Sequence, residues 1–442
     1  MRTKKAVVIL MMLVLTISAL ACGEKKAMPE TGKTDGETTK EAGNDITLTY
    51  QTNSASDMIT MVFDEYTKEH PNIHLDVQVV DNSQMDTKIA SQFNTNTLPD
   101  FAWMNGNMWR NGFLQTDSVL DVTEIIKNDI GESKFVQDTF MQLVTGDGSY
   151  VAFPAEMQIQ GFLVNPSLFE KYDLEIPKNF AELKHCAEVF QENGVVLFGS
   201  GTKDDWPTWP WYTWLRLWGI EEQGDALFQD HTLNWADSDV IQAYYRLAEL
   251  KEAGAFPENN ATITYEQSKT MFLAEQCAAL PTSTDQLAGI VNSDLDNMGK
   301  IQYWFGIGFE DSSYNQDIAV KVVNNGFGVS ANISEEKLAV LIDFFKYFYS
   351  TEGANILIKE GIVLPITEDV TTEVSPLVES VIDLVQDPSK KAVMGASYVW
   401  FGYHEMQIEY FIDFHMAHEQ LMNGTIDGSI KSEEIPERAK KM

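Results

Sequence analysis

The chain has 442 residues, of which 44% are hydrophobic and 11% aromatic, a composition typical of a folded protein long enough to form two lobes. Asp and Glu (66) outnumber Lys and Arg (31), so the formal net charge is -35 at pH 7. A surface this acidic repels phosphate backbones and anionic headgroups, which argues against nucleic-acid binding and against membrane docking through a basic face. It suits a neutral or a cationic ligand.

The N-terminus has the pattern of a secretory signal. A charged start is followed by an apolar stretch at residues 6–21, short for a membrane span, and small residues precede Cys22. The segment resembles a bacterial lipoprotein signal, which implies cleavage after Ala21 and a lipid on Cys22. The alternative is an ordinary cleaved signal in which the cysteine is incidental. Residues 23–45 are polar, which predicts a flexible tether.

Residues 46–104 alternate between strand and helix patterns. Alternating β-branched and apolar residues predict strands at 46–51, 73–80 and 100–104, and helical spacing of apolar residues predicts helices at 54–70 and 81–100. Strand, helix, strand, helix, strand implies a mainly parallel sheet with helices on both faces. Ligands of such sheets lie at the carboxyl ends of the strands, so we expect the loops after these strands to contribute to a site.

A second α/β block follows and ends in helices. Its expected segments are a helix at 179–194, a strand at 195–201, helices at 238–254 and 264–278, and strand and helices again over 320–361. Cys186 and Cys277 lie in apolar helical patterns without a CxxC motif, so we expect buried free thiols.

Five phrases, in this order, carry a resemblance to a known family. They are "ITLTYQ…FDEYTKEHPNIHLDVQVV", "NTNTLPDFAWMNGN", "YVAFPAEMQIQGFLVNPSLFEKYDLEIPKNFAEL", "TMFLAEQCAALPTS" and "GFGVSANISEEKLAVLIDFFKYFYSTEGA". Together they resemble the extracellular solute-binding proteins of ABC importers, in the carbohydrate-binding group that includes maltose-binding protein. The third phrase is the most specific, with matches at Tyr150, Pro154, Asn165, Phe169, Pro177 and Leu183.

The resemblance covers about residues 45–430 and implies a two-lobed α/β fold of the periplasmic-binding-protein type. Each lobe would be a mainly parallel sheet flanked by helices, with a cleft between them. The implied N-terminal lobe is 46–155 plus 318–363, and the C-terminal lobe is 158–315 plus 366–442. The implied protein is a monomer, lipid-anchored on the outer face of the cell membrane. It passes a carbohydrate, an oligosaccharide, to membrane-embedded permease subunits, with no catalysis, cofactor or metal.

Sugars present apolar faces and rings of hydroxyls, so their sites combine aromatic platforms with planar polar side chains. In chain order the candidates for ligand contact are Gln51, Asn53, Asn105, Asn107, Glu156, Asp204, Trp206, Trp209, Thr284, Asp285, Tyr398 and Trp400. The four residues after the first and third strands are amides that also occur commonly in turns. Tyr398 and Trp400 fall in the expected C-terminal cleft segment, with packing at a helix start as the alternative.

The stretch "DDWPTWPWYTWLRLWG" at 204–219 holds five of the ten tryptophans. From Pro210, which suits a first helical turn, Trp211, Trp214 and Trp218 share one helical face and are expected in the core. Asp204, Trp206 and Trp209 precede that helix in a loop after a strand, and the family's "TWP" segment implies a ligand floor there. The alternative for Trp206 is packing of the loop.

The resemblance implies a ligand-binding carboxylate at Glu156, in the first crossing between the lobes, and the alternative is a solvated hinge residue. Thr284 and Asp285 stand where the family often has a tryptophan, so they would offer hydrogen bonds instead. His404, His415 and His418 form one helical stripe without an HExxH motif, which favours a structural role over a metal site.

Two other functions remain open from the residues alone. A secreted glycoside hydrolase needs two carboxylates flanking the scissile bond, and in a chain with 66 acidic residues a pair can always be found. A polyamine or other cation would suit the acidic charge and would require several carboxylates with aromatic side chains.

Overall fold

The computed structural model describes residues 45–54, 57–104, 118–136, 139–140, 143, 148–204, 206–229, 231–323, 325–386, 391–393 and 408–442. Residues 44–442 form one compact unit. None of the helices in the described ranges is both long enough and apolar enough to cross a membrane. The expected signal and tether lie outside these ranges.

The first sheet contains the predicted strand–helix repeat. Along the chain come β1 (Ile46–Thr52), α1 (Met58–Glu69), β2 (Ile73–Val79), α2 (Asn82–Thr95) and β3 (Phe101–Met104). β1 pairs in parallel with β2 and β3. β10 (Gly326–Val329) pairs antiparallel with both β3 and β4 (Phe153–Pro154), so the strand order is β2-β1-β3-β10-β4 with β10 reversed. The repeat is confirmed, but the sheet is mixed.

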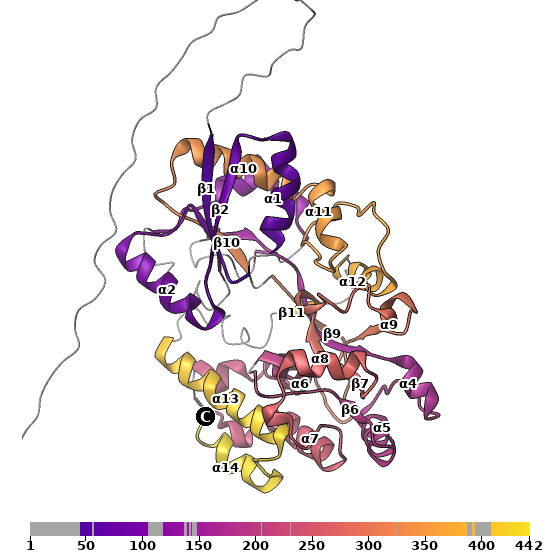
Figure 1. Cartoon of the computed structure of the whole chain (residues 1–442). Helices are drawn as coiled ribbons and strands as arrows, with labels where there is room; N and C mark the ends of the chain where they lie inside the picture. The colour runs from indigo at the N-terminus through magenta and orange to yellow at the C-terminus, as the bar shows by residue number, and fades with distance from the viewer. Residues whose placement is uncertain are drawn as a thin grey trace, which may run out of the picture. The chain divides into compact units, whose positions relative to one another are not determined.

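Local sequence explains why this part forms. The side chain of Asp57 accepts a hydrogen bond from Thr60 N in a capping box that starts α1. Helices α10 (Glu335–Phe348) and α11 (Thr351–Ile358) pack with α1, as Figure 1 shows. Phe345 of α10 stacks on Phe153 with ring centroids 4.1 Å apart. Aromatic packing therefore fixes the helices on the sheet.

The second sheet is built around β5, all seven residues of which are buried. Its strands run in the order β11-β9-β5-β7-β6, and β8 pairs with the far end of β5. Their bounds are β5 Gln158–Val164, β6 Val196–Phe198, β7 Cys277–Ser283, β8 Gln302–Trp304, β9 Ile318–Val322 and β11 Lys391–Val393. β6–β7 and β9–β11 are parallel, and the pairs that β5 makes are antiparallel.

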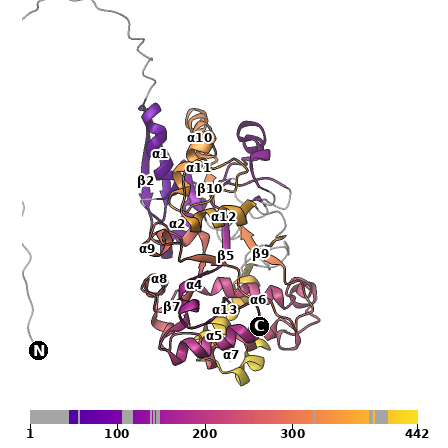
Figure 2. The ribbon, with the colours of Figure 1, turned by 90° about the vertical axis from the view of Figure 1, so that its right-hand side faces the viewer.

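Helices surround this second sheet (Figures 1 and 2). The α-helices are α4 Pro166–Lys171, α5 Phe180–Glu192, α6 Tyr212–Leu217, α7 Ile241–Glu252, α8 Tyr265–Leu273, α9 Asp294–Asn297, α12 Pro376–Gln386, α13 Ile408–Asp427 and α14 Ile435–Ala439. Short 3-10 or π segments are η2 Ile125–Ile130, η3 Glu132–Lys134, η4 Trp206–Trp211, η5 Asp225–Gln229, η6 Trp235–Asp237, η7 Asn260–Thr262, η8 Thr284–Gln286 and η10 Ser432–Glu434.

Three details differ from the sequence-based expectations. Trp206 and Trp209 lie in a 3-10 helix that runs directly into α6, not in a loop, and Pro210 falls inside that 3-10 helix. Cys277 begins β7 instead of continuing a helix, because α8 ends before Glu275, whose positive φ of 56° turns the chain into the sheet. Both Cys186 and Cys277 are buried free thiols, as expected.

The described chain passes between the two sheets at three places. Residues 155–157 join β4 to β5, residues 323 and 325 lie between β9 and β10, and residues 359–375 join α11 to α12, which contacts β8. Backbone bonds tie the three segments: Ala155 N donates to Asn325 O (3.0 Å) and Met157 N donates to Val363 O (2.8 Å).

One boundary is corrected. The expected N-terminal lobe began its second segment at residue 318, but residues 318–322 form β9 of the other sheet. The reason is cross-strand pairing, with Gln158 opposite Val322 and Ile159 opposite Lys321. The chain therefore returns to the first sheet only at β10.

Candidate functional site

Glu156 lies in the first crossing segment and is only 3% exposed. Its Oε1 accepts hydrogen bonds from Gln158 Nε2 (2.9 Å) and from Asn325 Nδ2 (2.7 Å), so it connects the first crossing with the second. Its Oε2 is buried and has no hydrogen-bond partner in the described part of the chain. The expected alternative, a solvated hinge carboxylate, is therefore wrong.

Asp285 reaches the same region from the end of β7. The preceding Thr284 is buried, and its hydroxyl accepts from Ile159 N and donates to Met157 O, both at 3.0 Å. These two bonds fix the segment η8 against the start of β5. Asp285 Oδ2 accepts from Gln286 Nε2 (2.7 Å), and Oδ1 is buried without a hydrogen-bond partner among the described residues.

The two carboxylates influence each other. Burial, and next the nearby charge of Asp285, raise the pKa of Glu156 to about 7. Burial also raises the pKa of Asp285, against the opposing effect of Ser283 and Gln286. The Ser283 hydroxyl lies close enough to Asp285 to lower its pKa, and it is buried without another partner among the described residues. Glu156, buried beside the charge of Asp285, therefore retains its proton up to nearly neutral pH.

Two glutamines of β5 extend the polar surface. Gln158 and Gln160 are alternate residues of one strand, so they share a face, and the Gln158–Glu156 bond shows that Glu156 lies on that side. Gln160 is 3% exposed, sits opposite Ser283, and has a buried Oε1 without a partner within the described ranges. Neither glutamine was among the residues predicted from the sequence, and nor was Asn325. Polar residues at alternate positions next to Glu156 were the available signal.

Other predicted residues lie elsewhere. Gln51, fully buried at the end of β1, accepts from Gln92 Nε2 (2.9 Å) and contacts the Met85 sulfur at 3.5 Å. Asn53, just beyond β1, is half-buried. Asp204 Oδ2 accepts from Tyr265 N (2.7 Å) at the first residue of α8, so one of its oxygens supports a helix start.

The tryptophans divide by burial. Trp211, Trp214 and Trp218 are buried in the core of the second sheet's helices, as predicted. Trp209 is half-buried against the same core, and its Nε1 is buried without a partner in the described structure. Trp206 belongs to η4 by its backbone, and its side chain lies outside the description.

Residues 40–355 match the model of a family described as bacterial extracellular solute-binding proteins. The chain belongs to this family. Its members are binding proteins, and their name places them outside the cytoplasm.

Solved structures with the fold of this solute-binding protein include three from different sources. One comes from work on xylan utilisation by the thermophilic bacterium Caldanaerobius polysaccharolyticus; it has a TM-score of 0.75 and 21% sequence identity, and the match covers 90% of this chain and 99% of that chain. The second is a chitin oligosaccharide binding protein with a TM-score of 0.72 and 19% identity, covering 90% of this chain and 98% of that chain. The third is the maltose-bound MalE3 of T. maritima with a TM-score of 0.69 and 15% identity, covering 89% of this chain and 98% of that chain. At identities below 25%, the structural likeness establishes the fold alone, and it confirms the two-lobed α/β architecture. No curated protein matches the sequence.

The remaining residues that the sequence predicted for this solute-binding protein's site and for its lipid anchor lie outside the described residues. They are Asn105, Asn107, Tyr398, Trp400 and the lipidation candidate Cys22. Of the residues predicted from the sequence, the structure thus brings together Glu156, Thr284 and Asp285 at the crossing between the sheets. It gives Gln51 and Asp204 hydrogen bonds within their own halves of the chain.

Proposed function

We propose that this solute-binding protein captures a carbohydrate, an oligosaccharide, between its two lobes and delivers it to an ABC importer. It does so as a monomer held on the outer face of the cell membrane by a lipid on Cys22. One observation carries the ligand part of the proposal: Glu156, in the first crossing segment, and Asp285, in η8 beside it, each have a buried oxygen without a hydrogen-bond partner in the described part of the chain.

The chemistry of these residues supports a polyhydroxylated ligand. Carboxylate and amide oxygens are acceptors that a sugar hydroxyl satisfies, and Glu156, Asp285 and Gln160 supply three of them. Glu156 is bonded to Asn325 of a second crossing, so a ligand that binds it also touches the joint between the lobes. The fold is shared with a chitin oligosaccharide binding protein and with a solute-binding protein in complex with raffinose, which supports the same ligand class.

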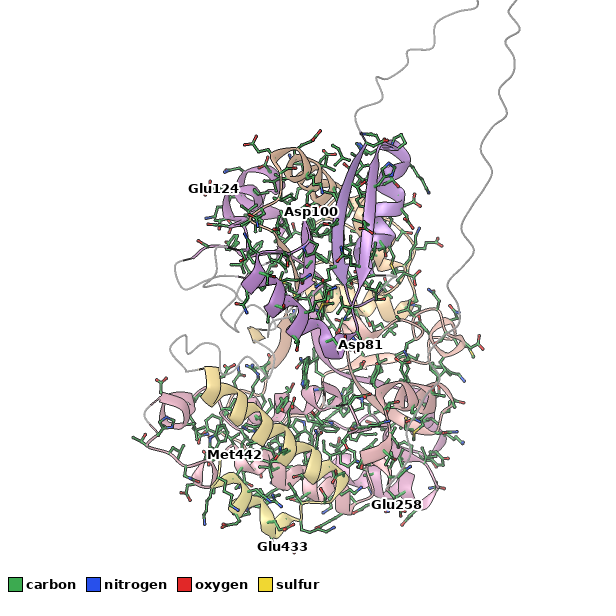
Figure 3. All side chains as sticks on the ribbon, turned by 60° about the vertical axis from the view of Figure 1, so that its left-hand side comes forward. Asp81, Asp100, Glu124, Glu258, Glu433 and Met442 are labelled. Atoms are coloured by element: carbon green, nitrogen blue, oxygen red, sulfur yellow. The ribbon has the colours of Figure 1, made fainter. Side chains whose placement is uncertain are left out.

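The acidic charge itself does not mark the site. In Figure 3, the exposed residues Asp81, Glu124, Glu258 and Glu433 are spread over both halves of the ribbon. Surface charge of this kind keeps a protein soluble and disfavours anionic ligands. Glu156 and Asp285 are distinguished by a buried carboxylate oxygen without a hydrogen-bond partner among the described residues, and not by the number of carboxylates.

A thermal-shift screen of the purified protein tests the proposal. The panel contains monosaccharides, oligosaccharides of several linkages, and polyamines. A saccharide present at 100 times its dissociation constant adds about 2.7 kcal/mol to the free energy of unfolding, which raises the melting temperature measurably. Stabilisation by a polyamine, with no response to any saccharide, would overturn the ligand class.

The same assay addresses catalysis. A binding protein leaves the stabilising saccharide intact after prolonged incubation, and chromatography of the sugar detects cleavage. Release of shorter sugars, abolished by Glu156→Gln, would instead establish a glycoside hydrolase.

A further inference from the structure

Three buried acceptor atoms at the crossing lack a donor in the described part of the protein. They are Glu156 Oε2, Asp285 Oδ1 and Gln160 Oε1. Folded proteins almost always pair buried polar atoms, so a group of unpaired acceptors on one face marks a place for a ligand that brings donors. The burial of Glu156 and Gln160, each 3% exposed, makes simple solvation a poor explanation.

The neighbouring donors are already engaged. Gln158 and Asn325 donate to the other oxygen of Glu156, and Gln286 donates to the other oxygen of Asp285. Tyr303 OH donates to Ile159 O. The Ser283 hydroxyl, which lies beside Asp285 and opposite Gln160, has no other partner among the described residues and can donate to only one of the three oxygens. The others have to receive donors from a bound molecule.

The two carboxyl groups also lack a positively charged partner among the described residues. No Lys or Arg forms an ion pair with Glu156 or Asp285 within the described ranges. Lys321 of β9 pairs with Ile159, and strand alternation therefore places it on the face opposite to Gln158 and Gln160.

The remaining titratable groups around the pair are tyrosines of three elements. Tyr50 of β1 interacts with the charge of Glu156, and Tyr265 of α8 and Tyr303 of β8 interact with that of Asp285. Burial raises the pKa of each tyrosine well above its usual value, so all three stay neutral. They neither compensate the two carboxylates nor add charge to them.

We propose that the Glu156–Asp285 pair binds a positively charged amino group, so that the carbohydrate carried by this protein contains an amino sugar. The carbohydrate part rests on the proposed function. A hydroxyl group supplies one donor and leaves two close carboxylates uncompensated. An ammonium group supplies three donors and cancels charge, which matches two neighbouring carboxyl groups that form no ion pair with a Lys or Arg of the described chain.

Binding of an amino group at this pair should depend on pH. Without ligand, burial and mutual repulsion keep a proton on the pair until the pH approaches the raised pKa of Glu156, about 7. A bound ammonium replaces that proton. Affinity for an amino sugar therefore rises between pH 5 and pH 7, by up to about tenfold per pH unit, with release of about one proton per ligand at pH 6. A neutral sugar displaces no proton.

Titration calorimetry with matched β-1,4-linked tetramers tests this. The probes are the glucosamine tetramer, its N-acetylated counterpart, the glucose tetramer, and spermidine as a cation that is no sugar. At pH 7 the glucosamine tetramer is expected to bind at least about tenfold more tightly than either neutral tetramer, and the advantage shrinks at pH 5. Buffers of different ionisation enthalpy measure proton release on the wild-type protein, without any variant.

Glu156→Gln and Asp285→Asn each keep the side-chain shape and one carbonyl oxygen. Both are expected to lower the affinity for the glucosamine tetramer by about tenfold or more. Glu156→Gln should also remove the proton release, whereas Asp285→Asn should shift it to lower pH, because burial still raises the pKa of Glu156. The control Glu192→Gln changes an exposed residue of α5 and leaves both unaltered.

The outcomes separate the two proposals. Equal or tighter binding of a neutral tetramer overturns the amine site and leaves the carbohydrate function standing. Binding of spermidine without any tetramer overturns the proposed function, and the amine site for a sugar with it. Binding of none of the four probes by folded protein overturns the amino-sugar assignment.

Discussion

At the scale of single residues, two side chains hold the crossing segments in place. Glu156 accepts from Gln158 and from Asn325 through one oxygen, and Thr284 bridges Ile159 N and Met157 O through its hydroxyl. Both are buried. They differ in one respect: the Thr284 hydroxyl both donates and accepts within the protein, while Glu156 Oε2 has no partner among the described residues.

Glu156→Gln is expected to change how stability depends on pH. The pKa of Glu156 in the folded protein, about 7, exceeds its value in the unfolded chain. Between about pH 4.5 and pH 7 the folded state therefore holds more protons, and the free energy of unfolding falls as the pH rises through that window. The variant lacks this loss, so its stability relative to wild type increases from pH 5 to pH 7.5, by on the order of 3 kcal/mol at most.

Urea denaturation at several pH values measures that difference. Glu192→Gln, exposed on α5, should run parallel to wild type. A Glu156→Gln curve that also ran parallel would show that the carboxyl is not held in its protonated form.

Thr284→Val is expected to destabilise the protein by about 1–3 kcal/mol at nearly constant volume, because Ile159 N loses its acceptor in a buried position. Thr284→Ser retains the hydroxyl and serves as the control. Chemical denaturation of the three proteins decides the point, and equal costs for Val and Ser would attribute the effect to the lost methyl group instead.

At the scale of elements, the stretch 204–219 has two structural tasks. Asp204 accepts from the first backbone N–H of α8, and the tryptophans of α6 and its flanks fill the core beside the second sheet. Trp214, for example, packs edge-on against Phe309 with ring centroids 5.0 Å apart.

Asp204→Ala should lower the free energy of unfolding by about 1 kcal/mol, since Tyr265 N at the start of α8 loses its partner. Its effect on saccharide affinity separates the two uses of this side chain. Unchanged affinity, measured by titration well below the melting temperature, would assign Asp204 to the helix alone, whereas a loss of affinity would support the ligand contact expected from the sequence.

Trp214→Ala is expected to cost about 3–5 kcal/mol of stability, because a fully buried indole is replaced by a cavity. Trp206→Ala, by contrast, should abolish saccharide binding if Trp206 forms the ligand floor. Paired measurements of melting temperature and affinity test both, and the reverse pattern would refute this division of the stretch.

At the scale of the whole molecule, local sequence patterns predicted most of the architecture. Alternation in β1 and β2 and the periodicity of α1 identify the first sheet without reference to distant residues. The placement of β9 was not predictable in this way, because its sheet is decided by pairing with β5, far away along the chain. The same holds for the site: Glu156 was recognisable, but its proximity to Asp285 results from the Thr284 bonds, which sequence spacing does not encode.

The most direct test of the account is a crystal structure of the protein with the saccharide that stabilises it best. We predict a sugar bound between the lobes, with a ligand oxygen or nitrogen within hydrogen-bond distance of Glu156 Oε2 and of Asp285 Oδ1. The described chain also has an apolar cavity beside α11 and α12, lined by Ala354, Ile358 and Val385 among others. A saccharide bound there, or anywhere away from Glu156 and Asp285, would contradict the central claim.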